Sequence, residues 1–452
     1  MATIPSYVQL TSSSVDILNA IRNSATANYR DYVPEATASA DSIRDIGAVI
    51  MQFPELQNEF LTALINRIGR VIVTSKMYSN PWSMFKKGIL EYGETIENIF
   101  VNIAEPFQYD PAVAESQLYK RNMPDVRAAF HILNYQKFYK DTIQEKHLRQ
   151  AFLSWDGVTE LIAKITESMY TAANYDEFLV MKYMLAKRIL NGNLYAQQLD
   201  LTDMHNAAAG IKGISNQLEF MSTKYNVTGV TTHTVKNDQY LILNADFDAY
   251  MDVGVLASAF HMDKAEFMGH RVLVDSFGEL DTDRLAKIFA DDDSYSAPSD
   301  SELAALKAVP GVLIDREWFM IYDNLMQFNE KYNDEGLYWN YWLHNWKIFS
   351  ANPFANAVVF VPDTPSVTSV SLSPASVTLP VGQSVLLTPT VVTANFASKA
   401  VVYTSSAPTK TQITPEGVVT ILDTAESADS ITITATSVFD SSKKDTMTIT
   451  VA

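Results

Sequence analysis

The chain has 452 residues, of which 47% are hydrophobic and 19% are charged, a composition typical of a globular protein with a large buried core. Its length suggests two or three domains, and the absence of cysteine excludes disulfides, thiolate metal sites and cysteine nucleophiles. The formal net charge of −18 argues against a protein that grips nucleic acid through clustered Lys and Arg.

The N-terminal region predicts helices. Val15–Arg22 has the apolar spacing of a short helix with Ser14 as its N-cap, and Leu56–Val73 predicts a longer one. The first residues, Met-Ala-Thr-Ile-Pro-Ser, lack the basic and apolar regions of a signal peptide. No apolar run approaches the ~20 residues that cross a bilayer. We therefore expect a protein that is not secreted and makes no membrane contact.

Residues 80–143 lack a helical period and predict an extended hairpin instead. Its arms are Ile96–Ile99 and Val126–Ile132, and the polar stretch 105–122 lies near its tip. Helix then dominates the sequence. Apolar residues recur at helical spacing over Val158–Met169 and again over Phe178–Ile189, and Gly192 follows in the position that ends a helix.

A mixed α+β region comes next. Strands are predicted at Tyr240–Leu243, Arg271–Asp275, Val312–Ile314 and Trp318–Tyr322. The aromatic stretch 336–346 predicts another strand, and after a turn at Asn352 and Pro353 the chain returns as a strand over Phe354–Val361.

The composition changes sharply near residue 363. Two prolines make 361–365 an extended linker, and all six Trp lie before it. Among the 89 residues from 364 onward, 45 are Ser, Thr or Val, which favours strands. A turn is predicted at 380–382, and the strands are predicted at Val367–Leu372, Ser384–Leu387, Val401–Thr404, Val418–Ile421, Ile431–Thr436 and Thr446–Val451. Short strands at this spacing predict a β-sandwich.

Motifs that carry chemistry are almost absent. The seven histidines are scattered, and the chain has neither a G-x-S-x-G elbow nor a phosphate-binding P-loop. A calcium loop starting at Asp291 would place Glu302 at its last position but lacks the central Gly, so a solvated acidic loop is the preferred interpretation. Asp246 and Asp248, placed on one face of a strand, and Asp252 are a weak hypothesis for paired carboxylates. No cofactor or metal is predicted.

The segment 367–451 resembles the group 2 bacterial immunoglobulin-like (BIG2) domain. The matching residues are Val370–Pro374, Leu379–Ser384, Val402–Ser406, Gly417–Thr420, Ile433–Ser437 and Thr448–Val451. That family usually has Trp where Tyr403 stands, and Tyr can fill the same space between the sheets. Such domains bind, space or decorate, and they define no reaction.

Residues 15–361 resemble the major capsid proteins of phi-29-type podoviruses. The specific stretches are Asp16–Thr37, Phe85–Ile103, Ala151–Trp155 and Asp315–Val361, the last running from DREWFMIYDNL through GLYWNYWLHNW to FANAVVFV. The resemblance implies the α+β HK-97-like capsid fold over 1–362 and an all-β immunoglobulin-like sandwich over 363–452. Within the capsid fold it implies an N-arm at about 1–75, an E-loop at 80–140, a P-domain at 141–200 and 311–362, and an A-domain at 200–310.

The function that this resemblance implies is structural. Copies are expected to form hexamers and pentamers of an icosahedral or prolate head, assembled in the host cytoplasm and retained in the virion. The expected partners are other copies, scaffolding protein, the portal or connector, packaged double-stranded DNA in weak non-specific contact, and a head fibre or decoration protein. The candidate assembly contacts are Arg22, Lys86, Lys87, Glu94 and Glu97.

A second interpretation comes from another class of protein. A secreted glycosidase or adhesin with a C-terminal immunoglobulin-like module would share the tail, but the missing signal peptide and the lack of a supported catalytic pair argue against it. A tail or fibre protein is a third alternative, and the helical middle of the chain disfavours it.

Overall fold

The computed structural model describes residues 14–37, 39–53, 55–56, 77–90, 95–107, 109–111, 124–144, 155–256, 270–290, 292, 295–336, 338–414 and 416–452. The chain divides into two compact units, the first made of residues 1–75 and 147–164 and the second of 76–146 and 165–452. Most of the predicted helix at Leu56–Val73 lies outside the described residues, and so does Glu94.

The first unit is a small helical bundle. It contains α1 (Ser14–Ser24), α2 (Ala27–Tyr32) and α3 (Ala40–Gln52), and it buries Ile21 and Tyr29 within its own apolar core. The Thr26 side chain accepts a hydrogen bond from the Tyr29 N–H, and the Ser39 side chain caps α3 in the same way. The predicted helix at Val15–Arg22 is confirmed as α1, which begins at the residue predicted as its cap.

A single long helix, α7 (Trp155–Leu190), carries both of the predicted amphipathic stretches. Its 36 residues span about 54 Å at 1.5 Å per residue. Gly192 follows it with a φ of +67°, and its N–H donates to the Ile189 carbonyl, so the predicted helix end is confirmed.

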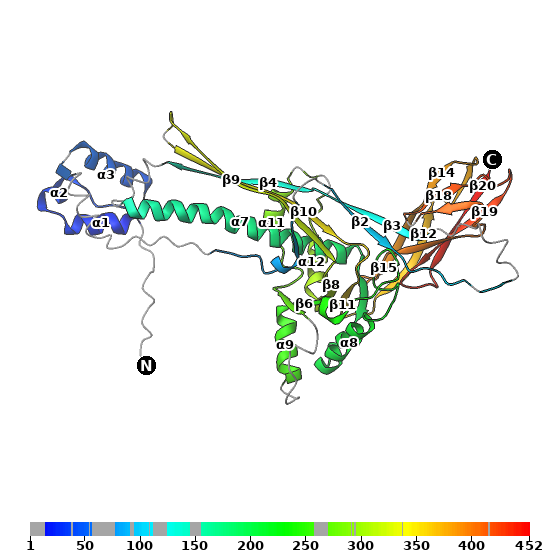
Figure 1. Cartoon of the computed structure of the whole chain (residues 1–452). Helices are drawn as coiled ribbons and strands as arrows, with labels where there is room; N and C mark the ends of the chain where they lie inside the picture. The colour runs from blue at the N-terminus through cyan, green and yellow to red at the C-terminus, as the bar shows by residue number, and fades with distance from the viewer. Residues whose placement is uncertain are drawn as a thin grey trace. The chain divides into compact units, whose positions relative to one another are not determined.

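The second unit is built on a five-stranded sheet of order β5-β11-β8-β6-β7. Its strands are β5 (Tyr195–Gln198), β6 (Gln239–Asn244), β7 (His270–Val274), β8 (Gly311–Asp315) and β11 (Ala357–Val361). Every residue of β11 is buried because alternate side chains enter two different cores. Val359 packs on the side of α7, α11 (Thr282–Ile288) and α12 (Asp300–Lys307), whereas Phe360 packs on the side of α8 (Met204–Gln217) and α9 (Ala245–Leu256) (Figure 1).

One sequence hypothesis about acidic residues is corrected, and a second lies partly outside the described residues. Asp246 and Asp248 were expected on one face of a strand, and that expectation is wrong, because both lie in the first turn of α9. Acidic residues favour that position because they face the positive end of the helix dipole. Of the proposed calcium loop, Asp291 and Asp293 lie outside the described residues, while Glu302 belongs to a capping box with Ser299 at the start of α12.

A second sheet, of order β1-β9-β10-β4, forms a long ribbon. Its strands are β1 (Lys86–Ile89), β4 (Tyr135–Gln144), β9 (Phe319–Asn333) and β10 (Tyr338–Ala351), and Figure 1 shows the last three running side by side. The 3-10 helix Ser83–Phe85 precedes β1, and a second one, Lys236–Asp238, precedes β6. The strand predicted to end at Tyr322 in fact continues to Asn333.

The predicted hairpin is confirmed. Strand β2 (Thr95–Val101) pairs antiparallel with β3 (Val126–Ile132), with Glu97 opposite Phe130 and Val101 opposite Val126. Of the predicted polar tip, 105–107 and 109–111 are described, and 108 and 112–122 lie outside the described residues.

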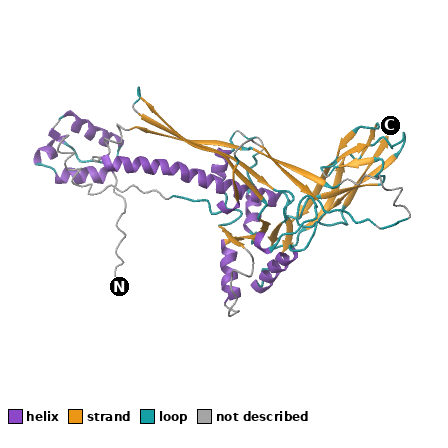
Figure 2. Cartoon of the chain, viewed as in Figure 1, coloured by secondary structure: helices purple, strands orange, loops and turns teal. Residues whose placement is uncertain are grey.

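The described residues of 366–451 form a sandwich of strands joined by turns and loops (Figure 2). Its strands are β12 (Ser366–Ser373), β13 (Ser376–Leu379), β14 (Ser384–Leu386), β15 (Thr388–Ala394), β16 (Val401–Ser405), β17 (Thr411–Ile413), β18 (Val418–Ile421), β19 (Ser430–Ser437) and β20 (Lys444–Val451). They form sheets of order β13-β20-β19-β16, β14-β18-β17 and β12-β15. Tyr403 packs against the core between the sheets, as expected from the sequence.

The sandwich is docked on the α/β part of the same unit. The Lys399 N–H donates to the Gly192 carbonyl at 3.3 Å, and the rings of Phe439 and Tyr195 lie 5.6 Å apart. Phe396, which has a φ of +61°, and Phe439 both pack against the core of the α/β part. The two parts are therefore joined by an apolar interface as well as by the linker at 362–365.

Candidate assembly interface

One face of the β2–β3 hairpin is apolar and exposed. We call it the outer face, and it consists of Thr95, Glu97, Ile99, Val101, Val126, Ala128, Phe130 and Ile132, all of which are exposed. Phe130 has 64% of its surface exposed and Ile99 has 56%. A contiguous apolar surface of this kind marks an interaction site more often than an accident of folding.

The opposite, inner face holds the hairpin on the second unit. Phe100 stacks on Phe354 with ring centroids 5.4 Å apart, and the Arg127 guanidinium donates to the Thr228 carbonyl. His131 Nδ1 lies 2.7 Å from Ser350 Oγ. Since a two-stranded ribbon is marginal by itself, these contacts are what fix its direction and leave the outer face free within the unit.

A buried charge network joins β1, β9, β10 and α7. Lys347 on β10 and Lys86 on β1 both contact Glu177 of α7 and Asp323 of β9, with Lys86 Nζ 2.7 Å from Asp323 Oδ2. Asn80 Nδ2 donates to Glu177 Oε1 at 2.6 Å. Burial alone would raise the pKa of Asp323, but Lys347 and Lys86 outweigh it and lower that pKa.

A second buried network lies one residue earlier on α7. Arg284 of α11 donates to both carboxylate oxygens of Asp176, at 2.7 and 3.1 Å, and the Tyr139 hydroxyl donates to Oδ2 at 2.7 Å. Further along α7, the buried Lys182 ammonium contacts Asp275. Helix α7 thus ties β1, β4, β9, β10 and α11 together, and β10 in turn contacts the hairpin through Ser350 and His131.

The predicted contact residues are dispersed by the structure. Arg22 Nε donates to the Val33 carbonyl at 2.8 Å within the first unit. Lys86 belongs to the buried network, and Lys87 pairs with Glu317 at 2.7 Å. Glu97 stands on the outer face, whereas Glu94 lies outside the described residues. Their role as contacts between subunits stays a prediction.

The apolar residues of the outer face were missed in the sequence. In β2, Ile96 and Phe100 point inward while Ile99 and Val101 point outward, so apolar side chains occupy both faces. The alternation of apolar and polar residues that would reveal an exposed face is therefore absent. The β-branched and aromatic residues of β2 and β3 predicted the two strands but not which of their faces is exposed.

Other chemistry is limited in the described parts of the chain. No grouping of three His, Asp or Glu ligands occurs there, and the Arg271 guanidinium contacts both Asp248 and Asp252, the residues of the carboxylate hypothesis. None of the described helices combines the length and apolarity of a membrane span.

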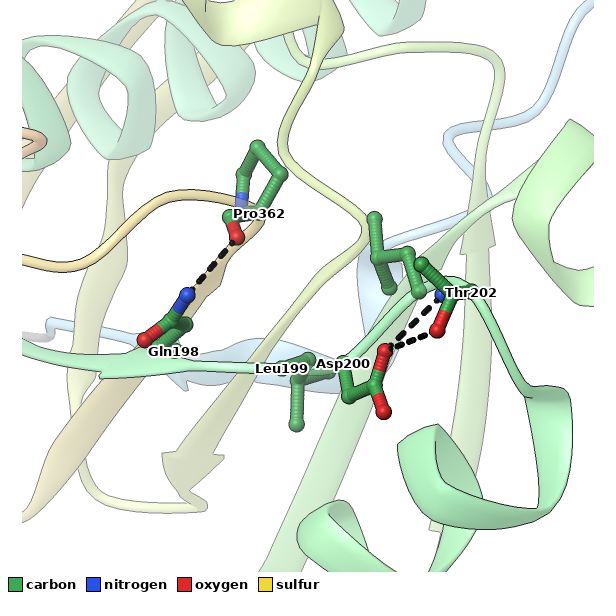
Figure 3. A pocket seen from close by; sticks show the side chains of 6 residues that line it. Gln198, Leu199, Asp200, Thr202 and Pro362 are labelled. Atoms are coloured by element: carbon green, nitrogen blue, oxygen red, sulfur yellow. Dashed lines mark hydrogen bonds between the residues drawn. The ribbon is translucent and has the colours of Figure 1, made fainter.

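A shallow pocket lies where β5 ends and the chain leaves β11 (Figure 3). Gln198 Nε2 donates to the Pro362 carbonyl at 3.3 Å, and the Asp200 carboxylate accepts hydrogen bonds from the N–H and hydroxyl of Thr202. The Thr202 hydroxyl and Asn206 lower the pKa of Asp200. The polar groups of this pocket thus satisfy one another and hold a turn together.

We expect the stability of the protein to fall on acidification through His131. Burial, and to a smaller extent Arg188, lower the pKa of this histidine below its ordinary value of 6.5. The unfolded chain then takes up a proton near pH 6.5 while the folded chain does not, so stability decreases as the pH falls below that value. Urea unfolding at pH 7.5 and 5.5 measures the loss.

The matched variants for this prediction are His131→Gln and His233→Gln, the latter replacing an exposed histidine. The former should flatten the dependence of unfolding free energy on pH, and the latter should leave it unchanged. If the unfolding free energy of wild type and of His131→Gln depended on pH in the same way, groups other than His131 would be the cause of that dependence.

Comparison with known proteins places this arrangement among phage capsids. The sequence profile of the Phi29-like phage major capsid protein family matches residues 18–361, and that of the group 2 bacterial Ig-like domain matches 366–448. The major capsid protein of Bacillus phage B103 is 37% identical over 434 residues, covering 94% of this chain and 90% of that protein. That of Bacillus phage PZA is 35% identical over 369 residues, covering 80% and 76%.

The fold is similar to a chain in the capsid structure of Staphylococcus phage Andhra. The TM-score is 0.53 at 16% sequence identity, with 66% of this chain and 88% of that chain covered. At this identity the likeness concerns the fold alone.

Proposed function

The chain belongs to the family of Phi29-like phage major capsid proteins, and from that premise we propose how its copies join into a shell. It is a structural protein of the virion and not an enzyme, with an HK97-like fold followed by a group 2 Ig-like domain. Capsid proteins of this family self-assemble, so the surface that contacts another copy is its functional site.

We propose that the outer face of the β2–β3 hairpin is covered by a neighbouring copy within hexamers and pentamers. The observation that carries this proposal is the exposure of six apolar side chains on a ribbon that the inner face fixes in direction. Fully burying an exposed Val, Ile or Phe side chain contributes about 1.5–3 kcal/mol, so burying the remaining half of one of these side chains contributes about half of that. A closed shell repeats that contact at every subunit, so modest energies add up.

We further propose the division of the capsid part that the sequence predicts. The N-arm is 1–75, the E-loop 80–140, the P-domain 141–200 with 311–362, and the A-domain 200–310. The hairpin lies in the proposed E-loop, and α7 is the spine of the proposed P-domain. The helical bundle found at 14–56 supports an N-arm that is folded rather than extended.

Other partners belong to the same proposal. They are scaffolding protein, a portal, a head fibre or decoration protein, and packaged DNA, with assembly in the host cytoplasm. The net charge of −18 supports weak, sequence-independent contact with DNA, because a lining that gripped phosphates would need clustered cations.

A matched pair of valines tests the assembly interface. Val126 on the outer face and Val402 on the sandwich are 50% and 52% exposed. We expect Val126→Asp, and more strongly Phe130→Asp, to reduce the yield of closed shells at least tenfold because each places a charge in an apolar contact. Val402→Asp should assemble like wild type.

Negative-stain electron microscopy and sedimentation measure the shells, and urea unfolding shows that each variant is folded. Normal shells from both hairpin variants would contradict the proposed interface. Absence of shells from the wild-type chain, with scaffolding protein supplied, would contradict the proposed function.

A further inference from the structure

A basic pocket of about 190 Å³ lies between the edge of the long ribbon and α11 in the second unit. Its lining comes from β4, α7 and α11 and includes Lys137, Phe138, Tyr139, Asp176, Arg284 and Lys287. Three of these six residues are cations and one is an anion, in a chain whose net charge is −18. The pocket is therefore a local exception to the acidic charge of the protein.

The negative charge in the pocket is already neutralised. Arg284 donates from Nε and Nη2 to the two carboxylate oxygens of Asp176, and the Tyr139 hydroxyl donates to Oδ2. The Asp176 side chain is 3% exposed, whereas the Arg284 side chain is 37% exposed. A guanidinium has five N–H donors, so three remain after the two bonds to the carboxylate. This pair thus adds no net charge but can still donate hydrogen bonds.

The other two cations, Lys137 and Lys287, form no ion pair with any described residue, although Asp283 lies one turn before Lys287 on α11. A cation in the last turn of a helix is favourable in any case, which accounts for Lys287. No helix end accounts for Lys137, because it comes from a strand. Two ammonium groups that line one small pocket repel each other, so an anion between them would relieve that repulsion.

The charge and the donors of the pocket fit a phosphate group. A phosphate monoester carries about −1.5 to −2 charges near neutral pH and has three strongly accepting oxygens. Two ammonium groups balance that charge, and the remaining N–H groups of the guanidinium supply further charge-assisted hydrogen bonds. A carboxylate carries a single charge and would leave one ammonium group unbalanced. The pocket therefore suits a phosphate monoester better than an acidic side chain.

An exposed aromatic ring borders the same pocket. Phe138 is 59% exposed, and one of its neighbours is the ring of His344 at 5.6 Å. Strand β4 is at the edge of its sheet, so side chains from both of its faces border the pocket. Every nucleobase has a π-face that can stack on an aromatic ring. The pocket thus has phosphate donors and a stacking surface side by side.

We propose that this pocket binds the terminal phosphate of a nucleotide. Lys137, Lys287 and the remaining N–H groups of Arg284 hold the phosphate, and the base stacks on Phe138. The bound phosphate joins β4 to α11 and so stabilises the edge of the ribbon. This inference goes beyond the proposed assembly function and does not depend on it, since none of these residues belongs to the outer face of the hairpin.

Isothermal titration calorimetry of the full chain tests the site, with adenosine monophosphate and inorganic phosphate as probes at constant ionic strength. Both should bind, and the nucleotide should bind severalfold more tightly because its base adds a contact. Lys137→Gln and Lys287→Gln should each weaken the binding of both probes about tenfold, since each removes a charge-assisted hydrogen bond. Phe138→Ala should weaken the binding of the nucleotide alone.

The matched control is Lys331→Gln, which removes an exposed lysine of β9 and should leave both affinities unchanged. Urea unfolding gives a second readout. Phosphate should raise the midpoint of unfolding of the wild type and of Lys331→Gln, because it binds only the folded chain, but not that of the double variant Lys137→Gln, Lys287→Gln. Without phosphate, the double variant should unfold at no lower a urea concentration than the wild type.

Two results would overturn this inference and leave the proposed function intact. One is that neither probe binds, and the other is that Lys331→Gln weakens binding as much as the pocket variants do. Equal affinities for the two probes, unchanged by Phe138→Ala, would overturn the base contact and identify inorganic phosphate as the ligand. Shell formation is measured separately, so its failure would overturn the proposed function and not this site.

Discussion

Replacement of Glu177 by Leu is expected to lower the free energy of unfolding by about 3–5 kcal/mol. This carboxylate is buried and contacts the ammonium groups of Lys347 and Lys86 while accepting a hydrogen bond from Asn80. Without it, Asp323 alone faces two ammonium groups, and Lys347 is itself only 4% exposed. Urea unfolding measures the loss.

The double variant Glu177→Leu, Lys347→Met is the control for this prediction. It removes one anion and one cation and leaves Lys86 paired with Asp323 at 2.7 Å. Apolar replacement of a whole buried pair is often neutral or stabilising, so the double variant should recover much of the stability. A double variant as unstable as the single one would mean that the loss comes from packing and not from an unpaired charge.

Replacement of Gly192 by Ala is the second substitution that we expect to lower stability strongly. Its matched control is Gly229→Ala. Both glycines have nearly the same backbone conformation, with φ values of +67° and +66°. A Cβ on Gly229 meets nothing within 4 Å, whereas one on Gly192 would lie 2.6 Å from the Ala397 carbonyl oxygen of the sandwich. Alanine is strained in the left-handed backbone region at both positions. The difference in unfolding free energy between the two variants therefore reports the docking of the sandwich.

We expect Gly192→Ala to lower the free energy of unfolding by about 1–3 kcal/mol more than Gly229→Ala does, which is the usual penalty for an overpacked contact. Spin labels on Glu219→Cys and Ser441→Cys should give one narrow distance in the parent chain and in Gly229→Ala. In Gly192→Ala the distance should broaden as the sandwich swings on its linker. A narrow, unchanged distance in Gly192→Ala would show that the docking does not depend on this close approach.

Local signals in the sequence were sufficient for much of the fold. The density of Ser, Thr and Val predicted the sandwich, and Gly192 marked the helix end because a left-handed position favours glycine. Helix α8 was missed because its buried stripe includes the small residues Ala207 and Ala208, which resemble loop composition. The second half of β9 was missed because it is largely exposed and the run Asn329–Lys331 interrupts its apolar residues.

Less of the candidate interface could be predicted from the sequence. Glu177 and Lys347 are 170 residues apart, and no local pattern predicts that they meet. Lys86 was expected at a contact between subunits, yet in the folded chain its charge meets Glu177 and Asp323. In the sequence, Ile99 and Phe130 look like ordinary strand residues. Whether they are exposed depends on which face of the hairpin the rest of the fold covers. Pairings of this kind arise from topology and not from spacing.

The position of β11 has a consequence for biosynthesis. In the order β5-β11-β8-β6-β7 this strand lies between two that precede it in the chain, although it is the last strand of the α/β part to leave the ribosome. Until residue 361 has been translated, the sheet has a gap with two unpaired edges in its middle. A chain that terminates before residue 361 therefore cannot complete this sheet, and the hairpin lacks part of the unit against which it packs.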